Sequence, residues 1–193
     1  MPTSPSPSAF PCALATLDKV AARTPDGVTL FDNLSLTFGP ERTGVVGRNG
    51  AGKSTLLRLI AGDLSASEGS VTRAASVGVL DQRSDPSRDE TTGQTLGVAP
   101  ALAAIHRLLA GEGDAQDMAD ADWTLAPRIA SALAEVGLKG LPMDRATRSL
   151  SGGEQTRLRL AGLILAAPDL ILLDEPTNHL DVQARRWVAE VLG

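Results

Sequence analysis

Residues 47–54 have types and a spacing that suit phosphate binding. The segment reads GRNGAGKS, which fits the pattern of a glycine, four residues and then Gly-Lys-Ser. Backbone N–H groups must converge on phosphate oxygens, and the glycines keep that approach free of side chains. Lys53 supplies a compact positive charge for the terminal phosphates, and Ser54 supplies a hydroxyl for Mg²⁺. The sequence therefore predicts a phosphate-binding loop.

The flanking segments predict the elements that such a loop needs. Thr43–Val46 predicts the end of a short apolar strand, and Thr55–Ala61 predicts a helix that Gly62 ends. Because the helix begins near Lys53, its first N–H groups and the positive end of its dipole add to the phosphate site. A Gly-rich turn that does not bind phosphate is the alternative, and the flanking strand and helix argue against it.

Two adjacent carboxylates follow an apolar run later in the chain. Leu170–Leu173 is continuously apolar, as in a strand buried on both faces of a parallel sheet, and it leads into Asp174 and Glu175. Ligands bind at this edge of open α/β sheets. Asp174 is the candidate Mg²⁺ ligand, and Glu175 is the candidate residue that polarises an attacking water. Gln82 follows another candidate strand and can point into the same site, although a lone glutamine there is more often plain surface.

A second segment of small residues, Ser151-Gly152-Gly153, precedes a predicted helix over Thr156–Leu165. Small residues before a helix leave its N-terminus exposed, which suits an anion. The alternation of apolar residues elsewhere predicts strands over 13–22, 28–38, 70–74 and 75–80, with a turn at Thr24–Gly27. In the second strand, a period of two places Phe31 and Asn33 on one face. The opposite face then carries Leu30, Leu34, Leu36 and Phe38.

Residues 84–147 predict a helical subdomain inserted into the α/β body. Thr91 or Thr92 is a candidate helix cap, 101–110 and Ala121–Val136 are predicted helices, and Gly111–Asp117 is a predicted acidic loop. His106 is expected to be a surface or packing residue, and Trp123 is expected to anchor the subdomain. Residues 1–12, rich in proline and serine, predict a disordered tail.

The composition limits the function classes. The chain has 193 residues, which suggests one domain, and its net charge of −5 does not indicate a nucleic-acid-binding domain. The single cysteine, Cys12, excludes an internal disulfide and suits a reducing compartment. No apolar run is long enough to span a membrane, and the N-terminus lacks the features of a signal peptide. The expectation is a soluble cytoplasmic protein.

Together the motifs resemble those of the ATP-binding-cassette (ABC) nucleotide-binding domain, from about Leu14 onward. The matching segments are 47–55 (Walker A), Gln82 (Q-loop), Leu150–Gln155 (signature), Leu170–Glu175 (Walker B) and Leu180-Asp181 (D-loop). The resemblance implies an α/β fold: a P-loop NTPase core with a mixed or parallel sheet, an antiparallel β subdomain and an inserted helical subdomain. It makes 13–193 a single cassette and implies ATP and Mg²⁺ as cofactors.

The resemblance also assigns roles to individual residues. Those implied to bind ATP are Gly47, Arg48, Asn49, Gly50, Ala51, Gly52, Lys53, Ser54 and Thr55. Those implied to hold Mg²⁺ are Ser54, Gln82 and Asp174, with Glu175 as the catalytic carboxylate and Asp181 in the D-loop. Those implied to complete a nucleotide site on a partner cassette are Ser151, Gly152, Gly153, Glu154 and Gln155.

The run from Asp174 to Asp181 resembles that of the ABC-F subfamily, soluble members without transmembrane domains. The resemblance implies an ATPase that acts on the ribosome, including antibiotic resistance by ribosome protection, and makes residues 84–147 the site of the subfamily's arm. The acidic stretch Gly111–Asp117 does not resemble an RNA-contacting tip. The alternatives are the ATPase subunit of a transporter and a nucleotide-binding fragment without turnover of its own.

The chain departs from the subfamily pattern in three ways. It holds one cassette where the subfamily usually has two, and the position of the switch histidine falls beyond Gly193, with His179 in the wrong motif to replace it. The aromatic residue that stacks on adenine in many members aligns with Ala22. We therefore expect the N-terminal part of a longer protein, whose isolated cassette hydrolyses ATP weakly unless a second cassette, from the missing half or a homodimer, completes the site.

Overall fold

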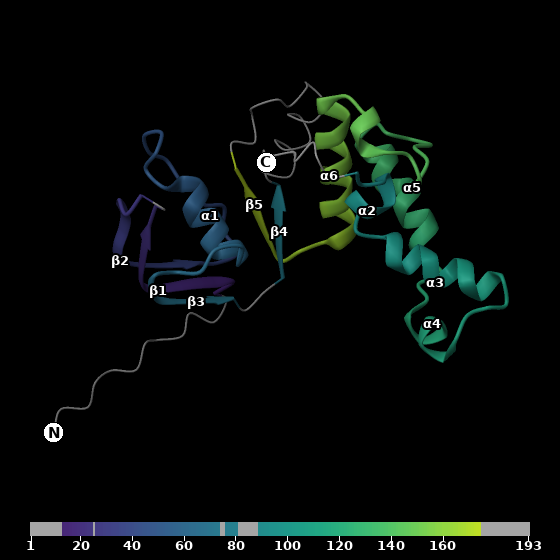
Figure 1. Cartoon of the computed structure of the whole chain (residues 1–193), viewed down its shortest axis with the longest axis horizontal. Coiled ribbons are helices and arrows are strands. Elements are labelled where there is room, and N and C mark those ends of the chain that lie inside the picture. Colours follow the sequence, from purple (N-terminus) through teal and green to yellow (C-terminus); the bar gives the residue numbers. More distant parts are fainter. Residues whose placement is uncertain (1–12, 25, 74–75, 81–88, 175–193) are drawn as a thin grey trace. The chain divides into compact units, whose positions relative to one another are not determined.

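The computed structural model describes residues 13–24, 26–73, 76–80 and 89–174 (Figure 1). These residues form two compact units. The first draws on the chain up to Val79 and on Pro168–Asp174, and the second on Leu80–Ala167. The predicted tail, residues 1–12, lies outside the described residues. No helix in the described parts of the chain is long and apolar enough to cross a membrane.

The first unit contains a three-stranded antiparallel sheet. Its strands are β1 (Ala15–Arg23), β2 (Thr29–Phe38) and β3 (Glu68–Arg73), in the order β2-β1-β3. The predicted turn between the first two is confirmed, because the Gly27 amide donates to the Thr24 carbonyl at 2.9 Å. The antiparallel part of the predicted fold is therefore present, and the predicted strands 13–22, 28–38 and 70–74 are confirmed within a few residues.

The predicted period of two along β2 is wrong. Leu36 is 38% exposed, and three other side chains of β2 pack on the core: Phe31, Leu34 and Phe38. The pairing of β1 with β2 shifts register at three places, and Lys19 and Asn33, with φ of 51° and 55°, lie near two of them. A local irregularity of this kind moves the following residues to the other face of a sheet. Phe31 consequently lies on the core side.

Helix α1 (Lys53–Ala61) packs on this sheet and confirms the helix predicted after the phosphate loop. Leu56, Leu59 and Ile60 are buried in one cluster with apolar residues of β1. Gly62 ends the helix in the left-handed conformation, φ 95°, and its N–H donates to the Arg58 carbonyl. This is the common glycine termination of helices. The start of α1 is thereby held on the core of the first unit.

Arg73 of β3 caps the C-terminal end of α1 through hydrogen bonds. Its Nε and Nη2 donate to the carbonyls of Ile60 and Leu59, both at 2.6 Å. We expect Arg73→Ala to lower the free energy of unfolding by about 1–2 kcal/mol, because it removes two charge-assisted bonds that are partly exposed to solvent. Urea unfolding measures the change. Arg58→Ala, at an exposed arginine of the last turn, is the control. Equal losses in the two variants would contradict this role.

A two-stranded sheet completes the first unit. It consists of β4 (Val77–Leu80) and β5 (Leu170–Leu173). The Leu170 amide donates to the Ser76 carbonyl at 3.0 Å, and since both strands start at this bond they run parallel. The predicted strand over Thr43–Val46 is wrong: the segment forms neither helix nor strand, and Val46 is 93% exposed. No strand among the described residues pairs with it.

Asp169 joins the starts of these two strands. Its Oδ2 accepts from the Ser76 hydroxyl at 2.6 Å and from the Ser76 amide at 3.0 Å. These bonds hold the pKa of the Asp169 carboxyl below its usual value, the hydroxyl contributing most. A lowered pKa in the folded state stabilises the fold at neutral pH, and this contribution disappears as the pH falls through that pKa.

We therefore expect Asp169→Asn to lower the free energy of unfolding most at pH 7. The difference in this free energy between variant and wild type should shrink below about pH 4. Urea unfolding at several pH values measures it, and a difference that does not change with pH would contradict it.

The second unit is helical, as predicted for the insert. Its helices are α2 (Thr92–Thr95), α3 (Ala99–Leu109), α4 (Ala115–Asp120), α5 (Leu125–Glu135), the short 3₁₀ helix η1 (Thr147–Ser149) and α6 (Gly152–Ala166). Helix α6 contacts α5 and α2. Gly162 of α6 lies against the backbone of Thr95 and Leu96, where an added Cβ would be in van der Waals contact with the Thr95 carbonyl oxygen, at 3.4 Å. The core includes Leu158 and Leu160, both fully buried.

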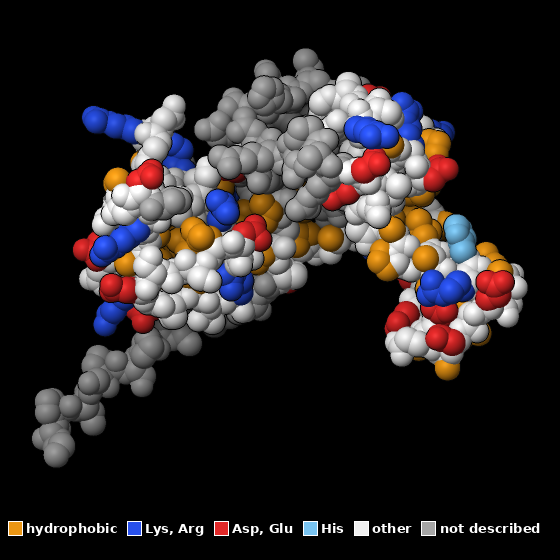
Figure 2. Space-filling model, viewed as in Figure 1, with side chains coloured by type: hydrophobic (Ala, Val, Ile, Leu, Met, Phe, Trp, Pro, Cys, Tyr) orange, Lys and Arg blue, Asp and Glu red, His pale blue; other side chains and the backbone are white. Residues whose placement is uncertain are grey.

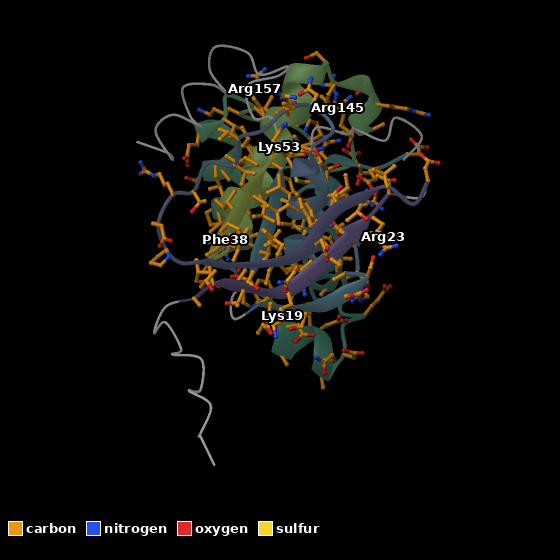
Figure 3. The ribbon with its side chains drawn as sticks, turned by 90° about the vertical axis from the view of Figure 1, so that its left-hand side faces the viewer. Lys19, Arg23, Phe38, Lys53, Arg145 and Arg157 are labelled. Atoms are coloured by element: carbon orange, nitrogen blue, oxygen red, sulfur yellow. The ribbon has the colours of Figure 1, made fainter. Side chains whose placement is uncertain are left out.

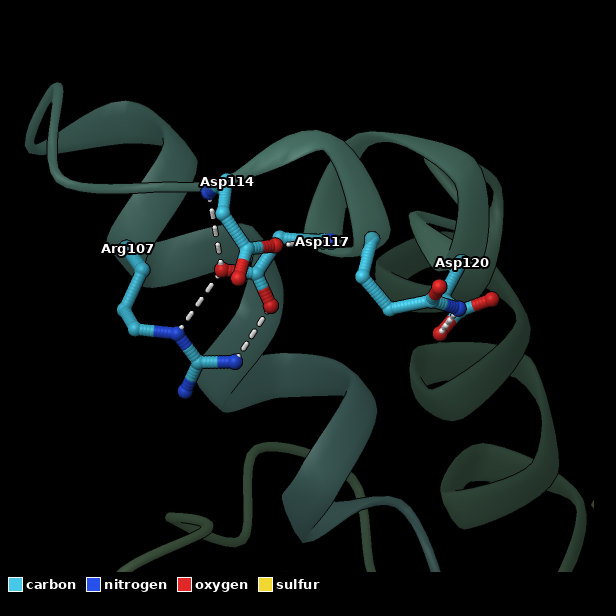
Figure 4. A network of polar contacts seen from close by, with 5 residues as sticks. Arg107, Asp114, Asp117 and Asp120 are labelled. Atoms are coloured by element: carbon cyan, nitrogen blue, oxygen red, sulfur yellow. Dashed lines mark hydrogen bonds and ion pairs between the residues drawn. The ribbon is translucent and has the colours of Figure 1, made fainter.

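The structure differs from the prediction in several details of the insert. Thr91 caps α2 with a capping box, as predicted, but a helix, α4, begins inside the predicted acidic loop. Asp114 caps α4, and Asp117 is held by two bonds from the Arg107 guanidinium (Figure 4). The helix predicted over Ala121–Val136 starts only at Leu125. The local capping box outweighs the glycine-rich composition of this stretch.

The surface of α3 and α4 carries acidic and apolar side chains together (Figure 2). His106 is exposed, which selects the surface position from the two predicted alternatives. Trp123 is 56% exposed, so the prediction that it anchors the subdomain is wrong. The core of the second unit is instead built from aliphatic side chains of α5 and α6. An aliphatic core is expected for a chain with only 3% aromatic residues.

Candidate nucleotide-binding site

The loop predicted to bind phosphate leads directly into the start of α1. Gly50 and Gly52 have φ of 81° and 91°, a conformation that residues with a side chain rarely adopt. Gly52 is the N-cap, and its carbonyl accepts the first helical bond, from the Leu56 amide at 2.8 Å. The N–H groups of the first turn have no acceptor within the helix. Those of Lys53, Ser54 and Thr55 are therefore available to an anion, at the positive end of the helix dipole.

Lys53 turns back over this loop. Its Nζ donates to the carbonyls of Gly47 and Arg48, at 2.9 and 3.1 Å (Figure 3 labels Lys53). The Ala51 amide also bonds to the Arg48 carbonyl, at 3.1 Å, which folds the loop into an arch. The ammonium group is thus held over the arch by the loop's own backbone. It stands where a compact positive charge can meet phosphate oxygens.

The candidate magnesium ligands of the described residues come from two elements that pack together. Ser54 is exposed at the second position of α1, and Asp174 is half-buried directly after β5. Leu172 of β5 joins the core cluster that contains Leu59 of α1. A hydroxyl and a carboxylate are oxygen ligands of the kind Mg²⁺ takes. Within the described residues no three His, Cys, Asp or Glu side chains gather as a metal site.

Three of the predicted site residues fall on undescribed segments. Gln82, Glu175 and Asp181 lie outside the described residues. Their assignments as Q-loop glutamine, catalytic carboxylate and D-loop aspartate therefore stay predictions. The structure brings together α1 and β5, the elements that carry Ser54 and Asp174.

The predicted signature segment begins α6 of the second unit. Ser151 is the N-cap: its Oγ accepts from the Glu154 amide at 3.3 Å, and the Glu154 carboxylate accepts from the Ser151 amide at 2.8 Å and hydroxyl at 2.7 Å. These bonds, the hydroxyl first, hold the pKa of Glu154 below its usual value. Gln155 Nε2 donates to the Thr147 and Leu150 carbonyls.

This arrangement leaves Gly152 open. A side chain at Gly152 would meet no atom within 4 Å, whereas Ser151, Glu154 and Gln155 are already engaged with the surrounding backbone and with one another. The predicted helix over Thr156–Leu165 is present but begins earlier, at Gly152, so the two glycines lie in its first turn instead of before it. The phosphate loop belongs to the first unit and this segment to the second, and each is described by itself.

The sequence matches the model of one protein family, described as ABC transporter, over residues 31–178. Three curated relatives are similar to most of the chain. It is 37% identical to the tylosin resistance ATP-binding protein TlrC of Streptomyces fradiae, covering 95% of this chain and 38% of that protein. It is 35% identical to the protein named "Probable ATP-binding protein YheS" of Escherichia coli K12, covering 97% of this chain and 27% of that protein. It is 37% identical to the energy-dependent translational throttle protein EttA of Mycobacterium tuberculosis H37Rv (92% and 35%).

Solved structures share the fold at lower identity. One is cbiO1 of Clostridium perfringens, part of the ABC transporter complex cbiONQ, with TM-score 0.62 and 22% identity over 94% of this chain and 73% of that chain. Another is a nucleotide-free ATP-binding cassette from an ABC transporter, with TM-score 0.63 and 21% identity over 93% and 76%. At these identities the likeness concerns the fold alone. The chain spans 27–38% of the length of the three curated relatives.

Proposed function

The chain belongs to the ABC transporter family, and on that premise we propose that it binds MgATP through residues 47–55 and acts as an ABC-F type ATPase. The three curated relatives are ABC-F proteins, which confirms the resemblance to that subfamily. The observation that carries the binding proposal is the Lys53 ammonium, held by the Gly47 and Arg48 carbonyls beside the first-turn N–H groups of α1. Positive charge and unpaired donors then converge on one small region, which suits a chain of phosphates.

The roles of the remaining residues follow from their chemistry. Ser54 and Asp174, with Gln82, would hold the Mg²⁺, which when bound neutralises charge on the phosphates. Glu175 would orient the attacking water and accept its proton. A rigid N-cap at Ser151 would present Gly152 and Gly153 to a nucleotide held by another cassette. Each cassette therefore supplies two different half-sites, and we propose that turnover requires a second cassette.

The dependence on a second cassette is tested by measuring ATPase rate per chain against protein concentration, with sedimentation to report association. A rate that rises with the dimer fraction, or on addition of a second cassette, is the expected result. Full turnover by a monomeric sample would contradict it. Lys53→Ala gives the background ATPase rate for both measurements, at rising protein concentration and with an added second cassette, because that variant lacks the charge that meets the phosphates.

We further propose that the ATPase acts on the ribosome. The support comes from the names of two relatives, a translational throttle protein and a tylosin resistance protein. The test is co-sedimentation of the Glu175→Gln variant with MgATP, because removal of that carboxylate favours a nucleotide-bound form. Retention with ribosomes but not with membrane vesicles is expected. Retention with membranes alone would favour the transporter subunit, and Lys53→Ala is the nucleotide-free control.

A further inference from the structure

Phe31 contacts the phosphate loop from the sheet beneath it. It pairs with Ala22 across β1 and β2, and its half-buried ring packs on the core cluster of the first unit. A Cβ placed on Gly52 would lie 2.7 Å from Phe31 Cζ and 3.1 Å from Cε1. The end of the ring therefore lies directly against the backbone of Gly52. Leu30 lines the same space, its Cβ 3.4 Å from that position.

Gly52 is the residue through which the loop and the helix are joined. It is buried, has φ of 91°, caps α1 and precedes Lys53. Any shift of Gly52 would move the Lys53 ammonium and the first-turn N–H groups together, because they follow it along a rigid helix. An aromatic ring with two side-chain torsions is a stiff support that loses little entropy on packing. A displacement of about 1 Å in a binding constellation is enough to weaken it substantially.

We infer that Phe31 is a positioning residue of the nucleotide site. Its ring holds Gly52, and through it the start of α1, where the N–H groups and Lys53 meet the phosphates. The inference rests on the proposed binding of MgATP. Because the ring supports the backbone of the loop, its removal weakens every ligand that the loop holds by its phosphates, whether or not that ligand carries a base.

The chain offers a matched control in Phe38. It lies on the same strand and packs on the same core cluster, but pairs with Ala15 at the other end of β1 (Figure 3 labels Phe38 and Lys53). Phe31→Ala and Phe38→Ala both remove a half-buried ring from this core. A merely structural role predicts similar losses of stability and similar, small losses of affinity. A positioning role predicts that the losses of affinity differ.

The experiment measures the Kd of MgATP and of inorganic tripolyphosphate with Mg²⁺ by titration calorimetry, and stability without ligand by urea unfolding. We expect Phe31→Ala to weaken both ligands by about 10-fold, equivalent to about 1.4 kcal/mol. Phe38→Ala should weaken either ligand by less than about 2-fold, and Phe31→Leu should reduce the loss from about 10-fold to about 3-fold. If Phe31→Ala does not fold, the affinities of Phe31→Leu and Phe38→Leu are compared instead. We then expect Phe31→Leu to bind both ligands about 3-fold more weakly than wild type, and Phe38→Leu to bind them as wild type does.

Equal losses in the Phe31 and Phe38 variants would overturn the inference. So would a loss confined to MgATP, since the ring would then contact the base rather than support the loop. A wild-type chain that binds neither ligand overturns the proposed function, and the inference with it. Wild-type binding with unchanged affinity in the Phe31 variants overturns the inference alone.

Discussion

Lys53→Ala is expected to weaken MgATP binding by about 100-fold and to bring hydrolysis to background. The loss, about 2.7 kcal/mol, is the size expected when a charged partner is removed from a desolvated contact. Calorimetric titration measures the affinity. The ammonium group bonds to the carbonyls of Gly47 and Arg48, on an exposed loop. The free energy of unfolding should therefore change little.

Lys139→Ala is the matched control for this prediction. Lys139 is exposed in the second unit, after α5. Its removal changes the net charge of the chain by the same amount, so the control separates the local effect at the phosphate loop from a general electrostatic one. Similar losses of affinity in both variants, or an unchanged affinity in Lys53→Ala, would contradict the assignment of the loop.

Leu59→Ala is expected to lower the free energy of unfolding by about 3–4 kcal/mol. Leu59 is fully buried in the cluster that joins α1 to β1 and β5, and its truncation leaves a cavity at the centre of that cluster. Urea unfolding of the first unit measures the loss. The affinity for MgATP of whatever fraction remains folded should also fall, since the cluster holds the helix that begins at Lys53.

The control for the core prediction is Leu109→Ala. Leu109 ends α3 and is 72% exposed, so the same truncation there should change stability by less than about 0.5 kcal/mol. A large loss at Leu109, or a small one at Leu59, would contradict the core described for the first unit.

The elements that carry the site were largely predictable from local sequence. A run of helix formers between Gly52 and Gly62 predicts α1, and four consecutive aliphatic residues predict β5. The glycines at 50 and 52 take the positive φ that their place in the motif requires. Ser151 and Glu154 stand three residues apart, a spacing that allows the capping box seen at α6.

What could not be predicted depends on contacts between distant segments. Phe31 faces the core because the register of β1 and β2 shifts near Lys19 and Asn33. No local sequence pattern predicts the positive φ values of these two residues. The contact of Phe31 with Gly52 follows from that register and was therefore missed. Likewise, Val46 is apolar, yet it lies exposed because no strand among the described residues pairs with its segment.

The central claim is that the arch formed by residues 47–54 binds the phosphates of MgATP, and calorimetric titration of MgATP into the wild-type chain tests it most directly. The account predicts saturable binding of one nucleotide per chain, displaced by inorganic tripolyphosphate and lost when Lys53 is replaced by alanine. Absence of saturable binding, or binding that tripolyphosphate does not displace, would contradict it.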